Sequence, residues 1–156
     1  MNMVFYEIEH GIRSNHFLYE RHVDHSFPLH MHRCYEMVLL LNGEMTIQMD
    51  KQAYCLHAGD LMLIKPHRIH SYHTQQEKHS ECALCIFSGD LIAAITESLT
   101  KYRLSSSVLH DTPALYRDLF LDAQKYDDVA QIKGFLYLLC SRFYQQLNTE
   151  EEDIFA

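Results

Sequence analysis

Apolar residues change their spacing about halfway along the chain. Up to about residue 88 they form short runs that are separated by turn signals, such as Asn42-Gly43, Asp50-Lys51 and Ala58-Gly59-Asp60. Short runs divided in this way are typical of β-strands, and Asn-Gly between two of them is a strong hairpin signal. The first half of the chain therefore predicts a β-sandwich or β-barrel, with a hairpin at Asn42-Gly43.

Beyond residue 88 the apolar residues recur at helical spacing. One helix is predicted over residues 88–99, a second begins at Asp111-Thr112-Pro113, and a third spans about residues 128–147. The third helix is apolar around much of its circumference, so we expect it to pack on its own barrel and also against a partner chain. A fully intramolecular helix pair is the alternative. The residues expected at the interface of a homodimer are Phe135, Leu136, Leu139 and Phe143.

The segment from His30 to Glu36 concentrates residues that bind metals. Strand side chains alternate between two faces, so a strand over residues 30–41 would place His30, His32 and Glu36 on one face. Imidazoles and carboxylates are ligands that divalent first-row metals prefer, and His70 is the candidate for a fourth ligand. Zinc, nickel, manganese and iron all suit this set. The alternative is a polar pocket that binds a small molecule directly.

The same alternation turns further side chains toward the barrel interior, where jelly-roll proteins bind their ligands. These inward residues would line a pocket for a small molecule with an apolar part and a polar handle. The residues of this predicted effector pocket are Val38, Leu40, Met62, Ile64 and Tyr72.

Composition limits the remaining possibilities. The 156 residues, 47% of them hydrophobic, fit one domain with a sizeable core. A formal net charge of −8 argues against direct contact with nucleic acid. The sequence has neither an apolar run long enough for a membrane span nor a secretory signal, which predicts a cytoplasmic protein. Five scattered cysteines predict reduced thiols, and a strand over residues 81–87 would turn Cys82 and Cys85 to opposite faces.

Two motifs resemble those of a known family. His30-x-His32-x-x-x-Glu36, followed by Gly43, matches the first cupin motif, and Gly59-Asp60 through His70 resembles the second. Over roughly residues 16–147 the chain resembles the N-terminal sensor domain of AraC-family transcription regulators. The resemblance implies a cupin-type jelly-roll barrel over residues 1–87 and an antiparallel helical hairpin for dimerisation within residues 88–147. It also implies a small-molecule effector whose binding is transmitted to a DNA-binding domain.

The paired helix-turn-helix units of that family do not follow the predicted hairpin. Residues 148–156 are acidic and look like the start of a linker. We therefore expect the sensor half of a longer regulator, which contacts DNA only through a domain missing from this chain, and we assign no catalytic residue. A standalone metal-dependent cupin enzyme, of the dioxygenase or sugar isomerase type, is the alternative. Residues 1–15 are expected to form either a first edge strand or an N-terminal arm.

Overall fold

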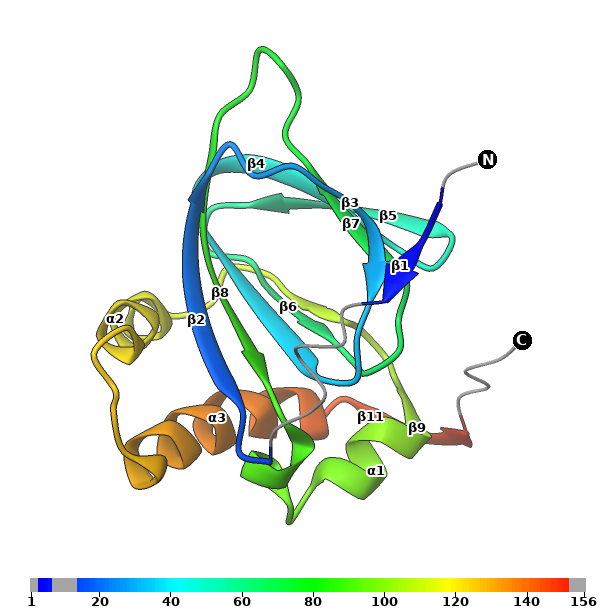
Figure 1. Ribbon diagram of the computed structural model, residues 1–156, viewed down its shortest axis with the longest axis vertical. Helices are drawn as coiled ribbons and strands as arrows, with labels where there is room; N and C mark the ends of the chain where they lie inside the picture. The colour runs from blue at the N-terminus through cyan, green and yellow to red at the C-terminus, as the bar shows by residue number, and fades with distance from the viewer. Residues whose placement is uncertain (1–2, 7–13, 152–156) are drawn as a thin grey trace.

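The computed structural model describes residues 3–6 and 14–151, and it contains strands followed by helices, as predicted (Figure 1). The strands are β1 (Phe5–Tyr6), β2 (Phe17–Val23), β3 (Phe27–Met31), β4 (Tyr35–Met49), β5 (Gln52–His57), β6 (Leu61–Ile64), β7 (His70–His73), β8 (Ser80–Phe87), β9 (Tyr102–Leu104), β10 (Val108–Leu109) and β11 (Leu147–Glu151). The helices are the 3-10 turn η2 (Gly89–Ile92), α1 (Thr96–Lys101), α2 (Ala114–Ala123) and α3 (Val129–Tyr144).

Strand β4 belongs to both layers of a jelly-roll barrel. Its first half pairs with β6 and β8, with Glu36 opposite Ile64, and its second half pairs with β5 and β7, with Ile47 opposite Tyr72. β2 and β10 extend the first layer, whereas β3 and β1 extend the second. Figure 1 shows the helices gathered on one side of the barrel. Side chains from both layers therefore point into the interior between them.

The hairpin predicted at Asn42-Gly43 is wrong, because β4 continues through these residues. The pairing of β4 with β8 shifts its register between Leu40 and Asn42, so the strand contains a β-bulge where it passes from one layer to the other. Gly43 has a φ of +78°, and a Cβ at this position would overlap the carbonyl oxygen of His79. The Asn-Gly signal thus marks a bend in one long strand, which only glycine permits here.

The single strand predicted over residues 30–41 is divided in two. β3 ends at Met31 and β4 begins at Tyr35, and in the bend between them the carbonyl of His32 accepts a hydrogen bond from the amide of His67 at 2.9 Å. The predicted alternation is still correct on each side of the break, since His30 and Glu36 are both buried. The three predicted ligands of this segment, His30, His32 and Glu36, therefore come from two strands and the bend that joins them.

Two hydrophobic cores result from this alternation. Val38, Leu40, Met62 and Ile64 lie with Cys82 in the barrel interior. A second core lies between the opposite face of the first layer and the helices. It includes Met37, Leu39, Leu61, Leu63, Cys85, Phe87, Phe120 and Phe135. The prediction that Cys82 and Cys85 face opposite ways is therefore confirmed.

The helical region differs from prediction mainly at its start. The helix predicted over residues 88–99 forms two shorter pieces, η2 and α1. α2 begins directly after Pro113, and α3 begins after Asp128, whose carboxylate accepts a hydrogen bond from the amide of Gln131 at 2.8 Å. The rings of Phe120 and Phe135 join the two helices with centroids 5.1 Å apart. Figure 1 shows α2 close to end-on and α3 lengthwise, so the two helices cross.

The four side chains predicted at a dimer interface lie elsewhere than expected. They are Phe135, Leu136, Leu139 and Phe143, and each is at most 4% exposed. All four pack in the core between α3 and the chain's own barrel, because they form the apolar stripe of that helix. The exposed side of α3 instead presents Leu138 and Tyr144, which are 48% and 41% exposed. The predicted interface residues are therefore wrong, and a partner chain could contact α3 only through its exposed side.

Both ends of the described chain form strands. β1 pairs in parallel with β3, so residues 5–6 form an edge strand, one of the two alternatives expected for residues 1–15. β11 pairs antiparallel with β9, so residues 148–151 of the predicted linker belong to a strand. Residues 7–13 and 152–156 lie outside the described residues. Among the described helices, none is long and apolar enough to cross a membrane.

Candidate metal centre

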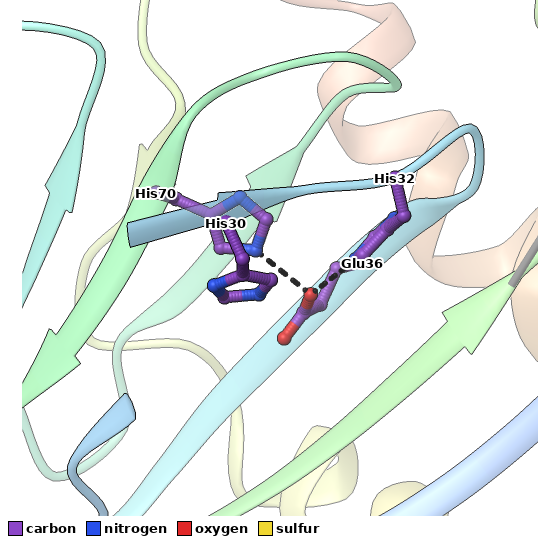
Figure 2. A group of neighbouring side chains, drawn as sticks. All are labelled: His30, His32, Glu36 and His70. Atoms are coloured by element: carbon purple, nitrogen blue, oxygen red, sulfur yellow. Dashed lines mark hydrogen bonds and ion pairs between the residues drawn. The ribbon is translucent and has the colours of Figure 1, made fainter. Parts of the chain in front are cut away.

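Three strands bring the predicted donors together in the barrel interior. His30 lies near the end of β3, His32 in the bend, Glu36 near the start of β4, and His70 at the start of β7. His30 is paired directly with His70 across the β3–β7 ladder. In Figure 2, His30 and His70 approach the Glu36 carboxylate from one side and His32 from the other. All four residues are at most 3% exposed, so the structure assembles the whole predicted set.

The Glu36 carboxylate is the centre of the cluster. Its Oε2 lies 3.0 Å from Nε2 of His32 and 3.1 Å from Nε2 of His70, and its Oε1 accepts a hydrogen bond from the hydroxyl of Tyr72. One ligand atom from each of His30, His32, Glu36 and His70 can be chosen so that all lie within 4.8 Å of one another. This spacing is close to that of donors around a single ion.

Backbone carbonyls fix how the three imidazoles are presented. In each ring, Nδ1 lies 2.8–3.0 Å from the carbonyl oxygen of a residue two positions away along the chain. The pairs are His30 with Pro28, His32 with Cys34, and His70 with Arg68. A carbonyl only accepts, so Nδ1 is the protonated nitrogen and Nε2 is the ring atom that can coordinate. Metal-binding histidines in proteins are commonly oriented in this way.

Burial and charge set the protonation states of the cluster. Burial, reinforced by the neighbouring His70, lowers the pKa of His30 from 6.5 to about 4, so this imidazole is neutral near pH 7. For Glu36, burial alone would raise the pKa, but the close contacts of its carboxylate with the rings of His32 and His70 outweigh burial and hold the pKa well below 4.5. Burial and the charge of Glu36 raise the pKa of Tyr72 well above 10, so its hydroxyl remains a donor.

The residues present fit a divalent metal ion. With Nδ1 protonated, a neutral imidazole directs the lone pair of Nε2 at the Glu36 carboxylate, which is unfavourable unless a proton or a cation lies between them. An ion held by His30, His32, Glu36 and His70 would remove this conflict and neutralise the buried carboxylate. Three nitrogen donors and one oxygen donor suit zinc, nickel, manganese and iron alike.

A cavity of about 260 Å³ adjoins the cluster. It is lined by Glu20, His22, His25, Phe27, His30, Glu36, Tyr72, Leu84 and Ile86. Of the five residues predicted to line an effector pocket, only Tyr72 lines this cavity. Val38, Leu40, Met62 and Ile64 point into the same interior but form the packed core beside it. The rings of His22 and His25 stack with centroids 3.9 Å apart, and burial followed by the effect of His22 lowers the pKa of His25 to about 4.

The cavity residues that sequence reasoning missed lie on β2, on β8, at the start of β3 and in the turn between β2 and β3. Along β2, Leu18, Glu20 and His22 share one face, whereas Phe17 and Tyr19 lie against the helical core. Side chains along β2 do alternate with a period of two. The inward face is partly polar, however, and the aromatic residues lie on the other face, so hydrophobicity does not identify the inward side. His22 and His25 are polar, and both line the cavity.

Comparisons with known proteins support the resemblance drawn from the motifs. The family model of the AraC-like ligand binding domain matches residues 15–139. An apo ToxT variant from Vibrio cholerae has a TM-score of 0.57 at 12% identity, over 90% of this chain and 62% of that one. Wild-type ToxT from the same organism, with an unsaturated fatty acid bound, has a TM-score of 0.58 at 13% identity, over 87% of this chain and 56% of that one. Comparison with curated proteins gave no match.

These matches differ in what they show. At 12% and 13% identity the ToxT structures show a shared fold, and this chain spans less than two thirds of the ToxT chains that it matches. The family match includes both cupin motifs and covers most of the sequence. The chain therefore belongs to the AraC-like ligand-binding domain family.

Proposed function

We propose that this chain is the effector-sensing domain of an AraC-type transcription regulator, and that its barrel holds a divalent metal with a small-molecule effector beside it. Family membership supports the sensor role. The observation that carries the metal proposal is the buried donor set of His30, His32, Glu36 and His70, which adjoins the cavity. Burying three imidazoles around an ionised carboxylate costs free energy that a bound cation would offset.

The cavity limits the size and chemistry of the effector. Its volume of about 260 Å³ suits a small molecule. Phe27, Leu84 and Ile86 form an apolar wall, and His30, Glu36 and Tyr72 form a polar end. The effector is therefore a compact molecule with an apolar part and a carboxylate or vicinal-diol handle directed at the metal centre.

A hydrogen-bonded route leads from the cluster to the last described strand. The segment after β6 meets the metal centre where the amide of His67 donates to the carbonyl of His32 at 2.9 Å. In the same segment, the ammonium of the buried Lys65 donates to the carbonyl of Tyr102 in β9 at 2.6 Å. β9 pairs with β11, beyond which a DNA-binding unit would follow. An effector could act through this route only if it binds one arrangement of the segment better than another.

A homodimer would use the exposed side of α3. Gly134, Leu138 and Ser141 lie three or four residues apart, so they share one face of the helix. A Cβ at Gly134 would meet no atom within 4 Å, and Leu138 is 48% exposed, so this face is open and partly apolar. Pairing through α3 in the cytoplasm would bring two DNA-binding units together, as the family resemblance implies.

Elemental analysis of protein purified without an affinity tag tests the metal proposal. We expect at least one metal ion per chain in the wild type, and a ratio lower by about one when His32 is replaced by alanine. A near-zero ratio in the wild type after metal-supplemented growth would refute the metal centre. A thermal-shift screen of small carboxylates and sugars, with and without metal, tests the effector proposal, since binding to the native state raises its melting temperature.

The donor set also favours a second candidate, a metal-dependent cupin enzyme. Three imidazoles and a carboxylate beside a cavity are found in dioxygenases and isomerases as well as in binding domains. A sensor and an enzyme differ in what they do to a compound that binds in the thermal-shift screen: a sensor releases it chemically unchanged, whereas an enzyme converts it. Mass spectrometry of that compound after incubation under air would return it intact for a sensor and converted for an enzyme.

A further inference from the structure

A second group of metal-binding side chains lies on the outer face of the barrel. Glu44 on β4 is paired directly with His57 on β5, and Cys55 lies two residues before His57, so the alternation of β5 puts both on the same face. The intervening Leu56 is fully buried, which shows that this face is the outer one. One ligand atom from each of Glu44, Cys55 and His57 lies within 4.8 Å of the others.

We propose that Glu44, Cys55 and His57 form a second, surface metal site that takes a thiophilic divalent cation of the zinc class. Donors around a tetrahedral zinc ion lie about 3.3–3.8 Å apart, given zinc–sulfur and zinc–nitrogen distances of about 2.3 and 2.0 Å. His57 Nε2 and Glu44 Oε2 are 3.6 Å apart already. Because the His57 side chain is 64% exposed and that of Glu44 31%, both can rotate by the small amount that closes the set.

The chemistry of this site differs from that of the buried cluster. A thiolate from Cys55 and a carboxylate from Glu44 together neutralise a divalent cation, and the sulfur donor selects zinc, cadmium or cobalt over magnesium or manganese. The chain's net charge of −8 favours any cation at its surface. Lys78 opposes binding, because its ammonium lies 3.5 Å from Oε1 of Glu44 and competes for that carboxylate. With three protein donors, solvent would fill the fourth position.

The distribution of cysteines makes this site measurable by thiol alkylation. Cys55 is exposed, whereas the other four cysteines are buried. Burial raises the pKa of all four above the ordinary thiol value, and the residues are Cys34, Cys82, Cys85 and Cys140. Iodoacetamide should therefore modify one thiol in the native chain. Since a metal-bound thiolate is a poor nucleophile, zinc should slow that modification by at least about tenfold.

Matched variants separate this site from the buried one. His57→Ala and Glu44→Gln should each restore alkylation of Cys55 in the presence of zinc, because each removes a ligand on the outer face of the barrel without disturbing the core. His32→Ala, which removes a ligand of the buried cluster, should leave the protection unchanged. Lys78→Ala should lower the zinc concentration that gives half protection. Protection that is absent in the wild type, or that persists fully in His57→Ala, would overturn the proposal.

Cobalt provides an independent readout. A cobalt–thiolate bond gives an intense charge-transfer absorption in the near ultraviolet, which nitrogen and oxygen donors do not give. We expect this band in the wild type and in His32→Ala, and its loss in Cys55→Ser. A band that persists in Cys55→Ser would mean that another cysteine binds the metal, and would also overturn the assignment.

Discussion

Replacing His32 with alanine gives the sharpest test of the buried cluster. His32 is 2% exposed, and its Nε2 lies 3.0 Å from the Glu36 carboxylate. The substitution removes one of four proposed ligands and leaves the other three in place. The experiment is best done in a Cys55→Ser background, because this background removes the sulfur donor of the outer site and so leaves one proposed zinc site.

The expected effect follows from the linkage between binding and folding. Zinc at about 100 times its dissociation constant stabilises the native state by about 2.7 kcal/mol. For a domain of this size each kcal/mol shifts the melting temperature by about 2–4 °C, so the background protein should gain about 5–11 °C. Loss of a direct ligand should weaken binding by about a hundredfold or more. The same zinc concentration then only equals the new dissociation constant, which leaves about 0.4 kcal/mol and a shift of about 1–2 °C.

The assay is thermal melting of each protein with and without zinc, and the quantity compared is the zinc-induced shift. This difference cancels any change that the substitution makes to the metal-free protein. His73→Ala is the matched control, because His73 is an exposed histidine on β7, the strand that also carries His70. An equal zinc-induced shift in His32→Ala and in the control would show that zinc binds elsewhere, and would refute the proposed ligand set.

Three further predictions concern stability and assembly. Gly43→Ala should lower the free energy of unfolding by about 2–5 kcal/mol in urea melts, because residue 43 has a φ of +78° and a Cβ there overlaps the backbone of His79. Gly134→Ala, on the open face of α3, should instead raise the free energy of unfolding by about 0.5–1 kcal/mol. Equal effects of the two substitutions would contradict this reasoning. In metal-free protein, the free energy of unfolding should fall by at least about 3 kcal/mol as the pH drops from 6.5 to 4. The reason is that the pKa values of His30 and His25 are both depressed to about 4, so the unfolded chain takes up these protons first. A flat urea-melt profile would contradict this expectation. Leu138→Glu should shift the proposed dimer toward monomer in sedimentation experiments, whereas Val23→Glu, at a 75% exposed position away from the helices, should not; a dimer that tolerates Leu138→Glu would place the interface elsewhere.

The residues of the candidate metal centre were predictable from sequence because their spacing follows the simplest rule of β-structure. A period of two placed His30 and Glu36 on one face, and that placement holds even though the strand breaks between them. The structure has β3, a bend and β4 where one strand was predicted, and both residues still point inward. His70 could be added because it belongs to the stretch that resembles the second cupin motif, and the structure pairs it with His30 across neighbouring strands.

Features that depend on tertiary packing were not predictable in the same way. Asn42-Gly43 is a good local signal for a hairpin, but the same glycine is required where β4 bends close to the backbone of His79. In α3, hydrophobicity alone could not say which apolar side chains face the barrel and which face solvent. That choice depends on where the helix sits on the second core, which turns Phe135 inward and Leu138 outward.

Tyr72 connects the buried donor cluster to the cavity. Its hydroxyl donates a hydrogen bond to Glu36, and its ring lines the space where the effector would bind. An effector that changes this hydrogen bond must change the affinity of the cluster for its metal, and thermodynamic linkage requires the metal to change the effector's affinity by the same factor. Titrating zinc with and without the effector, and the effector with and without zinc, should give equal ratios of dissociation constants. Tyr72→Phe should bring both ratios toward one, because it removes the hydroxyl and keeps the ring. Ratios unchanged in Tyr72→Phe would place the coupling on another contact, such as His30, which also lines the cavity.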